Sequence, residues 1–156
     1  MATENQASKL SATWMQNEHR LIRQLMAELE SHIRPIPISA GDEWLDRFRQ
    51  LFGRFRAHMR GHMSAEESDG GFLEPVVEYR PTLSRQVERL RHEHVQIATW
   101  FDRILEEIVV LTFNDVLLIE DACQRVEHLM SAIRHHEEHE ELLVTFVFSQ
   151  DIGTKD

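Results

Sequence analysis

The stretch HHEEHEELL (residues 135–143) places three histidines and four glutamates within nine positions. Charge-dense helical stretches are usually exposed to solvent. Residues four apart share one face of a helix, however, so His136 and Glu140 point to the same side. They continue an apolar series that stops at Ile133 and resumes at Leu143. The stretch is therefore predicted to be partly a charged surface and partly one half of an inward-facing polar site.

Glycine and proline divide the chain into four long segments with helical periodicity. The breaks fall at RPIPISAGD (34–42), at SDGGFLEPVVEYRP (68–81), which has room for one short helix, and at LTFND (111–115), where Asn114 is the expected N-cap. The predicted long helices span residues 10–34, 43–67, 82–110 and 115–148. Short connections favour antiparallel neighbours, so the predicted fold class is an all-α, up-down-up-down antiparallel four-helix bundle.

Each predicted helix carries an apolar series at alternating steps of three and four residues, as expected for a side that faces a bundle core. Six polar residues interrupt these series: His19, His62, Glu66, His94, His136 and Glu140. A buried carboxylate without a partner costs several kcal/mol, so two carboxylates beside four imidazoles require a common cause. A metal site between the helices provides that cause.

These six residues are expected to meet at one level of the bundle. His19 and His94 lie in the first halves of the first and third helices, whereas the pairs at 62–66 and 136–140 lie in the second halves of the other two. The pattern also repeats, because His94 follows His19 by 75 residues and the second pair follows the first by 74. Two related helix pairs would place equivalent ligands around a pseudo-two-fold axis, which predicts a site for two metal ions.

Composition narrows the classes of partner and compartment. The 156 residues suit one domain, and 17 basic against 27 acidic residues give a formal net charge of −10, which disfavours nucleic acid and anionic membranes. The single Cys123 excludes an internal disulfide and suits a reducing compartment. The first ten residues lack the pattern of a signal peptide, and no apolar stretch is long enough to span a bilayer. We therefore expect a soluble cytoplasmic protein.

The ordered set of motifs resembles the hemerythrin-like, HHE cation-binding family. Its signature is Glu-His on the first and third helices and His-x-x-x-Glu-Glu on the second and fourth. Here it reads NEHRLIRQL (17–25), HMSAEES (62–68), HEHVQI (92–97) and HEEHEELL (136–143). The resemblance covers about residues 10–148 and implies a single hemerythrin-like domain over residues 1–156, with a non-haem di-iron centre inside the bundle.

The resemblance also implies roles for the six polar residues. The terminal ligands would be His19, His62, His94 and His136, and the bridging carboxylates would be Glu66 and Glu140. In oxygen carriers of the family the last carboxylate falls one position later, so Glu141 is an alternative to Glu140.

Those carriers also have a fifth histidine, four residues from the histidine on the third helix. At that spacing this chain has Leu90 and Ala98. His58, one turn before His62, is the other candidate for a fifth ligand, although Met59 already occupies that turn of the apolar series. The missing histidine argues against reversible oxygen carriage.

Imidazole and carboxylate ligands suit iron, manganese or zinc. We expect two iron ions, with zinc or manganese as second choices; zinc is satisfied by four ligands, whereas iron would keep a position for an exogenous ligand. Two carboxylates among six ligands suggest a cationic pair that attracts small anions. The expected function is redox chemistry, or the binding or sensing of oxygen, nitric oxide or peroxide. The alternatives are a peroxide-consuming di-iron enzyme, or a metal-stabilised bundle for iron storage or protein interaction. Catalysis and oligomeric state are left open.

Overall fold

The computed structural model describes residues 4–37 and 41–149. The four long helices are α1 (Glu4–Ile33), α2 (Asp42–Glu67), α4 (Ser84–Val109) and α5 (Val116–Ser149), and between α2 and α4 come the short α3 (Leu73–Tyr79) and a 3-10 turn, η1 (Pro81–Leu83). Within the described ranges there is no strand, and no helix is long and apolar enough to cross a membrane. The predicted all-α fold class is confirmed.

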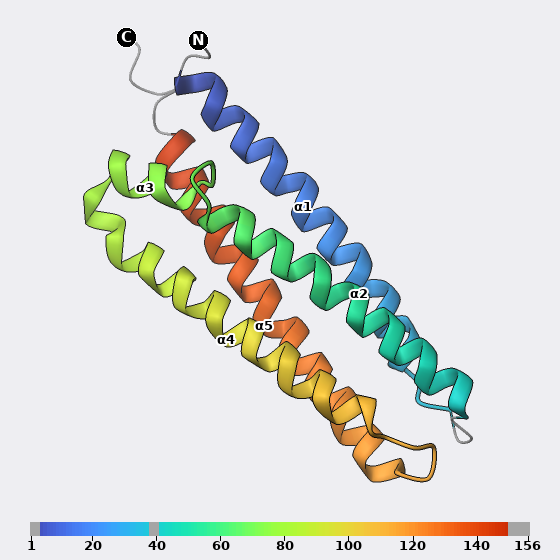
Figure 1. The fold of residues 1–156 in the computed structure, drawn as a ribbon. Helices are drawn as coiled ribbons and strands as arrows, with labels where there is room; N and C mark the ends of the chain where they lie inside the picture. Colours follow the sequence, from blue (N-terminus) through green and yellow to red (C-terminus); the bar gives the residue numbers. More distant parts are fainter. Residues whose placement is uncertain (1–3, 38–40, 150–156) are drawn as a thin grey trace.

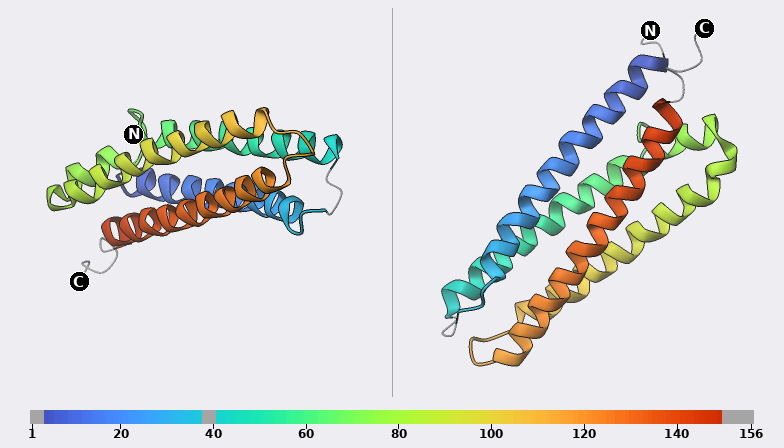
Figure 2. Two further views of the ribbon diagram at one scale, coloured as in Figure 1. Left: turned by 90° about the horizontal axis from the view of Figure 1, so that it is seen from below. Right: turned by 180° about the vertical axis from the view of Figure 1, so that it is seen from behind.

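The four long helices pack side by side as a bundle (Figure 1). Along the chain, α1 and α4 run in one direction and α2 and α5 run in the other, as the colours of Figure 1 show. Helix α1 contacts α2 and α5, and α4 contacts the same two helices, so each helix has two neighbours around a common core. The two further views in Figure 2 show the same arrangement, with α3 crossing one end of the bundle.

The observed helix boundaries lie within two residues of the predicted ones except at the start of α1. Helix α1 begins at Glu4 rather than at residue 10, because the prediction relied on an apolar series that residues 4–9 do not contribute to, although most of them are good helix formers. Helix α5 begins at Val116, and the carbonyl of Asp115 accepts the first helical hydrogen bond, from the Ile119 amide. The N-cap is therefore Asp115, one residue after the predicted Asn114.

Apolar side chains fill the bundle as two separate clusters. The larger one occupies the half that contains the α1–α2 and α4–α5 connections and includes four phenylalanines whose rings contact one another in series: Phe48, Phe52, Phe101 and Phe55. The smaller one lies at the other end, where Leu73 and Val76 of α3 pack against residues of α1, α4 and α5. The expected short helix within 68–81 is thus the element that closes this end.

Candidate metal centre

A layer of polar side chains separates the two apolar clusters. All four long helices contribute to it: on α1, for example, Met15 belongs to the smaller cluster, His19 to the polar layer and Ile22 to the larger cluster, whereas α2 ends within the layer. All six polar residues predicted to interrupt the apolar series are buried, with 3% or less of each residue exposed: His19, His62, Glu66, His94, His136 and Glu140. The structure therefore brings the whole predicted set together, at one level and away from bulk water.

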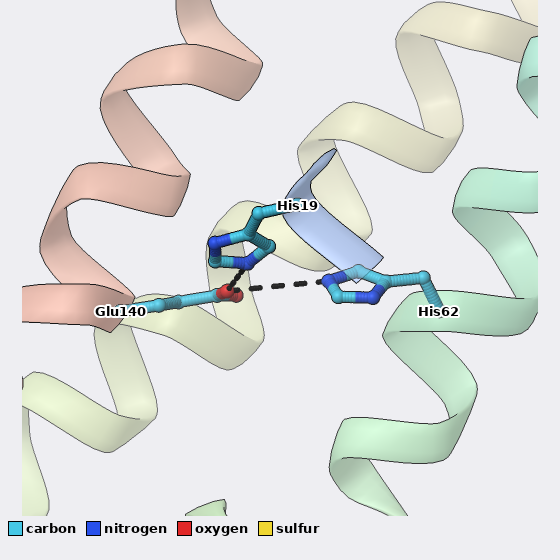
Figure 3. A group of neighbouring side chains, drawn as sticks. All are labelled: His19, His62 and Glu140. Carbon is cyan, nitrogen blue, oxygen red and sulfur yellow. Dashed lines mark hydrogen bonds and ion pairs between the residues drawn. The ribbon is translucent and has the colours of Figure 1, made fainter. Parts of the chain in front are cut away.

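One pair of histidines faces one oxygen of Glu140. Nε2 of His19 lies 3.0 Å from Oε2 of Glu140, and Nε2 of His62 lies 4.0 Å from the same oxygen. Figure 3 shows both rings converging on this carboxylate from α1 and α2. Potential ligand atoms of the three residues all lie within 4.8 Å of one another, which is close enough for one metal ion to bind all three.

The second pair of histidines faces the other oxygen of Glu140. Nε2 of His136 lies 2.5 Å from Oε1, and Nε2 of His94 lies 3.5 Å from it. These three residues form a second group whose potential ligand atoms lie within 4.8 Å of one another. The Glu140 carboxylate therefore stands between two histidine pairs and presents one oxygen to each, the position required of a bridging ligand.

Glu66 occupies the corresponding place on α2. Its Oε1 lies 2.5 Å from Nε2 of His62 and 3.9 Å from Nε2 of His94, which belong to different pairs. The backbone at Glu66 is held by the turn that follows α2. A Cβ added to Gly71 would lie only 2.0 Å from the carbonyl oxygen of Glu66, so only glycine permits this close approach.

The polar layer is poorly satisfied without a cation. Among the described residues, no hydrogen bond of normal geometry reaches either ring nitrogen of His62, Nε2 of His136 or either carboxylate oxygen of Glu66, and all of these atoms are buried. Buried polar atoms are nearly always hydrogen-bonded, since leaving one unsatisfied costs about 1–3 kcal/mol. Nitrogen and oxygen donors that converge in this way fit a bound metal ion, which would satisfy them together.

The charges in the layer depend on one another. Burial acts to lower the pKa of His62, but the contact with Glu66 and the charges of Glu66 and Glu18 raise it above its ordinary value. Burial acts to raise the pKa of Glu66, whereas the contact and charge of His62 lower it, so these two residues form an ion pair. Burial, followed by the charge of Glu66, raises the pKa of Glu140 to about 7. A cation would favour the ionised carboxylates and the neutral imidazoles, so metal binding should release protons.

The two alternatives left open by the sequence have different neighbours. Glu141 is turned outward, with Oε1 3.0 Å from Nδ1 of His19, on the side of the ring away from Glu140. Nε2 of His58 lies 3.0 Å from Oε2 of Glu18, and the His58 side chain is 29% exposed. In this arrangement Glu140, rather than Glu141, lies at the centre, and His58 is directed to Glu18.

One buried acidic residue was missed by the sequence reasoning. Glu137 was expected beside or opposite the apolar series, yet it is only 5% exposed, and burial raises its pKa to about 7. Helix α5 buries a wider face than a single series, and Glu137 falls in line with the buried Met130 and Val144, at steps of seven residues. That heptad spacing was the available signal.

The outlying histidines were expected to be exposed to solvent or to lie outside the ligand set. His135 and His139 pair with each other, with ring centroids 4.4 Å apart, and neither belongs to the two groups of potential ligands.

The comparison with known protein families agrees with this geometry. Neither the curated proteins nor the solved structures gave a match to the chain. The family described as "Hemerythrin HHE cation binding domain" matches residues 11–146, a range that contains all six residues of the buried layer. The match covers most of the 156 residues, and the buried histidines and glutamates form a cluster that can hold a metal. The chain therefore belongs to the hemerythrin HHE cation-binding family.

Proposed function

We propose that the buried layer holds two iron ions and that the protein uses them in redox chemistry, or to bind or sense a small molecule. The observation that carries this proposal is the position of Glu140, whose two oxygens each face a different pair of histidines. The residues that would hold the ions are His19, His62 and Glu140 on one side and His94, His136 and Glu140 on the other. Glu66, between His62 and His94, would be the second carboxylate shared by both ions.

The ligand set supports iron with open coordination positions. Two histidines and two shared carboxylates give each ion four protein ligands, whereas iron usually takes more than four. A ferrous pair would supply electrons to, or directly bind, a molecule such as oxygen, nitric oxide or peroxide. The apolar clusters above and below the layer exclude water, so the histidines and glutamates act in a medium where their charges are weakly screened.

His94 is the residue of the buried layer that lies beside a surface depression. This shallow depression of about 520 Å³ lies against α2 and α4, and Glu67, His94 and Ala98 are among its lining residues. At one turn to either side of His94 the helix carries Leu90 and Ala98, which cannot act as ligands. With His58 directed to Glu18, neither ion gains a fifth histidine, and the two ions would have equal numbers of histidines.

Reversible oxygen carriage is best served by one open and one closed ion, so this symmetry favours a redox or sensing role. The test is to mix oxygen with the deoxygenated, ferrous-loaded protein in a stopped-flow spectrometer and then to sparge with argon. We expect a spectral change that argon does not reverse. Recovery of the ferrous spectrum would contradict the proposal and indicate an oxygen carrier.

The same preparation separates the remaining alternatives. Sustained consumption of added peroxide would assign the centre to a peroxide-consuming enzyme. Zinc retained in preference to iron, with no response to oxygen or nitric oxide, would instead indicate a metal that stabilises the bundle.

An acidic protein with a buried centre of this kind is expected to act on small molecules rather than on nucleic acid. We propose a cytoplasmic location on the basis of its lone, buried Cys123.

A further inference from the structure

We propose that four glutamates outside the buried layer form a closed ring that orients the four histidines, each glutamate holding the histidine of a neighbouring helix. These outer glutamates are Glu18, Glu67, Glu93 and Glu141. The inference rests on the proposed metal centre and deepens it, because it assigns positioning residues to that centre. None of the four was expected to be a ligand except Glu141, the alternative to Glu140.

Every histidine of the layer has the same two-sided environment. Its Nε2 is directed toward the buried Glu66 or Glu140, and its Nδ1 is directed toward one outer glutamate. The Nδ1-to-carboxylate distances are 3.0 Å for His19 and Glu141, 3.3 Å for His62 and Glu18, 3.0 Å for His94 and Glu67, and 2.6 Å for His136 and Glu93. Three of these contacts are hydrogen bonds, whereas the contact of His62 with Glu18 is an ion-pair contact without hydrogen-bond geometry. Four independent side chains with the same orientation indicate a shared function rather than chance surface pairing.

The pairs connect the helices in a cycle. Glu18 of α1 reaches His62 of α2, and Glu67 of α2 reaches His94 of α4. Glu93 of α4 reaches His136 of α5, and the last glutamate returns from α5 to α1. Each long helix therefore provides one outer glutamate and receives one, so the ring ties all four helices together at the level of the proposed metals.

The ring explains why the motif contains pairs of adjacent residues. Each outer glutamate is next in sequence to a residue of the buried layer: Glu18 precedes His19, Glu67 follows Glu66, Glu93 precedes His94 and Glu141 follows Glu140. Neighbouring residues on a helix point about 100° apart. One member of each pair can therefore point into the bundle while the other points along the interface with the adjacent helix.

The chemistry of imidazole gives this arrangement a consequence for metal binding. A neutral histidine has one N–H donor and one lone pair. When Nδ1–H donates to an outer carboxylate, the lone pair is placed on Nε2, which faces the inner glutamates and would bind the ion. Carboxylates that hold ligand histidines in this way fix the tautomer and ring orientation and make the ligand nitrogen more basic.

The four outer glutamates also change the electrostatic expectation. Counting only Glu66 and Glu140 suggested a cationic pair of metals, but four more carboxylates lie within 3.3 Å of ring nitrogens of the ligands. Arg23, 3.4 Å from Glu141, and Arg89, 3.5 Å from Glu93, are both exposed and offset this charge only weakly. The centre is thus less cationic than its six inner residues indicate, which lessens the expected preference for anionic ligands.

Burial ranks the four members of the ring. The side chains of Glu18 and Glu93 are 19% and 18% exposed, whereas those of Glu67 and Glu141 are 38% and 45% exposed. Charge-assisted hydrogen bonds are stronger where water competes less. Glu93, which combines low exposure with the shortest contact, should therefore matter most.

The test uses zinc as a diamagnetic probe of the full-length protein. Zinc affinity would be measured by competition with a chelator for the wild type, Glu93→Gln and Glu93→Ala, with the exposed Glu138→Gln as the matched control on another helix. Because Gln keeps an acceptor oxygen, we expect affinity to fall in the order wild type, Gln, Ala, with a total loss of about 10- to 100-fold. Circular dichroism would confirm that each variant is folded.

A second readout identifies which histidine each glutamate holds. Long-range ¹H–¹⁵N spectra of the zinc-loaded protein report the protonation of each imidazole nitrogen. Glu93→Gln should shift Nδ1 of His136, on another helix, more than that of His94, its neighbour in sequence. A wild type that binds two zinc ions while the Glu93 variants keep its affinity and its His136 signal would overturn the ring alone. A wild type that binds no metal would overturn both the metal centre and the ring.

Discussion

Replacing Glu140 by glutamine should stabilise the metal-free protein and weaken its metal binding. The Glu140 carboxylate is fully buried, and its pKa rises from an ordinary value of 4.5 to about 7 because of burial and the charge of Glu66. Each pKa unit corresponds to about 1.4 kcal/mol. At pH 8 the ionised carboxylate therefore costs the metal-free fold on the order of 3 kcal/mol, and Gln removes that charge at nearly constant volume.

The sign of this effect sets its pH dependence. The folded-state pKa lies above the unfolded-state value, so between pH 4.5 and about 7 the folded protein binds more protons than the unfolded chain. The free energy of unfolding of the wild type therefore falls as pH rises through this window. The full cost of burying the ionised Glu140 carboxylate is present above pH 7. The advantage of Glu140→Gln should be absent near pH 4 and largest near pH 8.

Metal should reverse the order of stability. Because both histidine pairs share Glu140, the variant loses a ligand from each of the two proposed sites. At a given metal concentration a tighter-binding protein is stabilised more, so added metal should raise the melting temperature of the wild type more than that of the variant. If the substitution raises the melting temperature of the metal-free protein and lowers that of the metal-loaded protein, the buried charge serves metal binding at the expense of metal-free stability.

Thermal unfolding followed by circular dichroism measures both effects. Chelator-treated protein at pH 8 should melt roughly 6–12 °C higher in the variant, since about 1 kcal/mol moves the melting temperature of a chain of this size by about 2–4 °C. The desolvation of the buried Gln amide reduces this gain. Glu138→Gln, an exposed change on the same helix, is the control and should behave as the wild type. A metal-free Glu140→Gln variant that melts below the wild type at pH 8 would show that the ionised carboxylate does not destabilise the metal-free fold. A variant that gains as much from metal as the wild type would show that Glu140 is not a ligand.

Three further substitutions test the surroundings of the centre. Gly71→Ala should lower metal affinity, because its Cβ would displace the backbone at Glu66. The control Gly70→Ala, whose Cβ would meet nothing within 4 Å, should bind metal as the wild type does, and equal affinities of the two variants in a chelator competition would contradict this. His58→Ala should keep two metals per chain by elemental analysis, and the loss of one would make it a ligand. Phe101→Ala removes ring contacts in the larger apolar cluster and should lower the free energy of unfolding in urea by about 3–5 kcal/mol. A loss below about 1 kcal/mol would show that the cluster collapses around the gap.

The fold was largely predictable because each long helix repeats one strong signal. The series from Met15 to Ile33, for example, is buried throughout, and the residues that break it are the polar ones of the site. Boundaries were less predictable where that signal stops. Residues 4–9 extend α1 without contributing to the apolar series, and periodicity does not decide which of the adjacent polar residues Asn114 and Asp115 is the N-cap of α5.

The buried layer was predictable for the same reason, whereas the contacts of its histidines with the outer glutamates were not. His136 and Glu140 interrupt a core series, so their burial followed from helical spacing alone. The contact of His136 with Glu93 joins two helices, and its partner depends on how those helices are rotated against each other, which periodicity along one helix does not determine. Glu137 was missed because a single series was assumed where α5 buries a broader face.

The proposed centre binds two metal ions within one bundle through a shared carboxylate. Anaerobic titration of the metal-free protein with ferrous iron, with bound metal and protein quantified in the same sample, tests it most directly. We expect saturation at two ions per chain for the wild type and loss of both in Glu140→Ala, since that carboxylate faces both histidine pairs. Saturation at one ion, or a Glu140→Ala variant that still binds two, would contradict it.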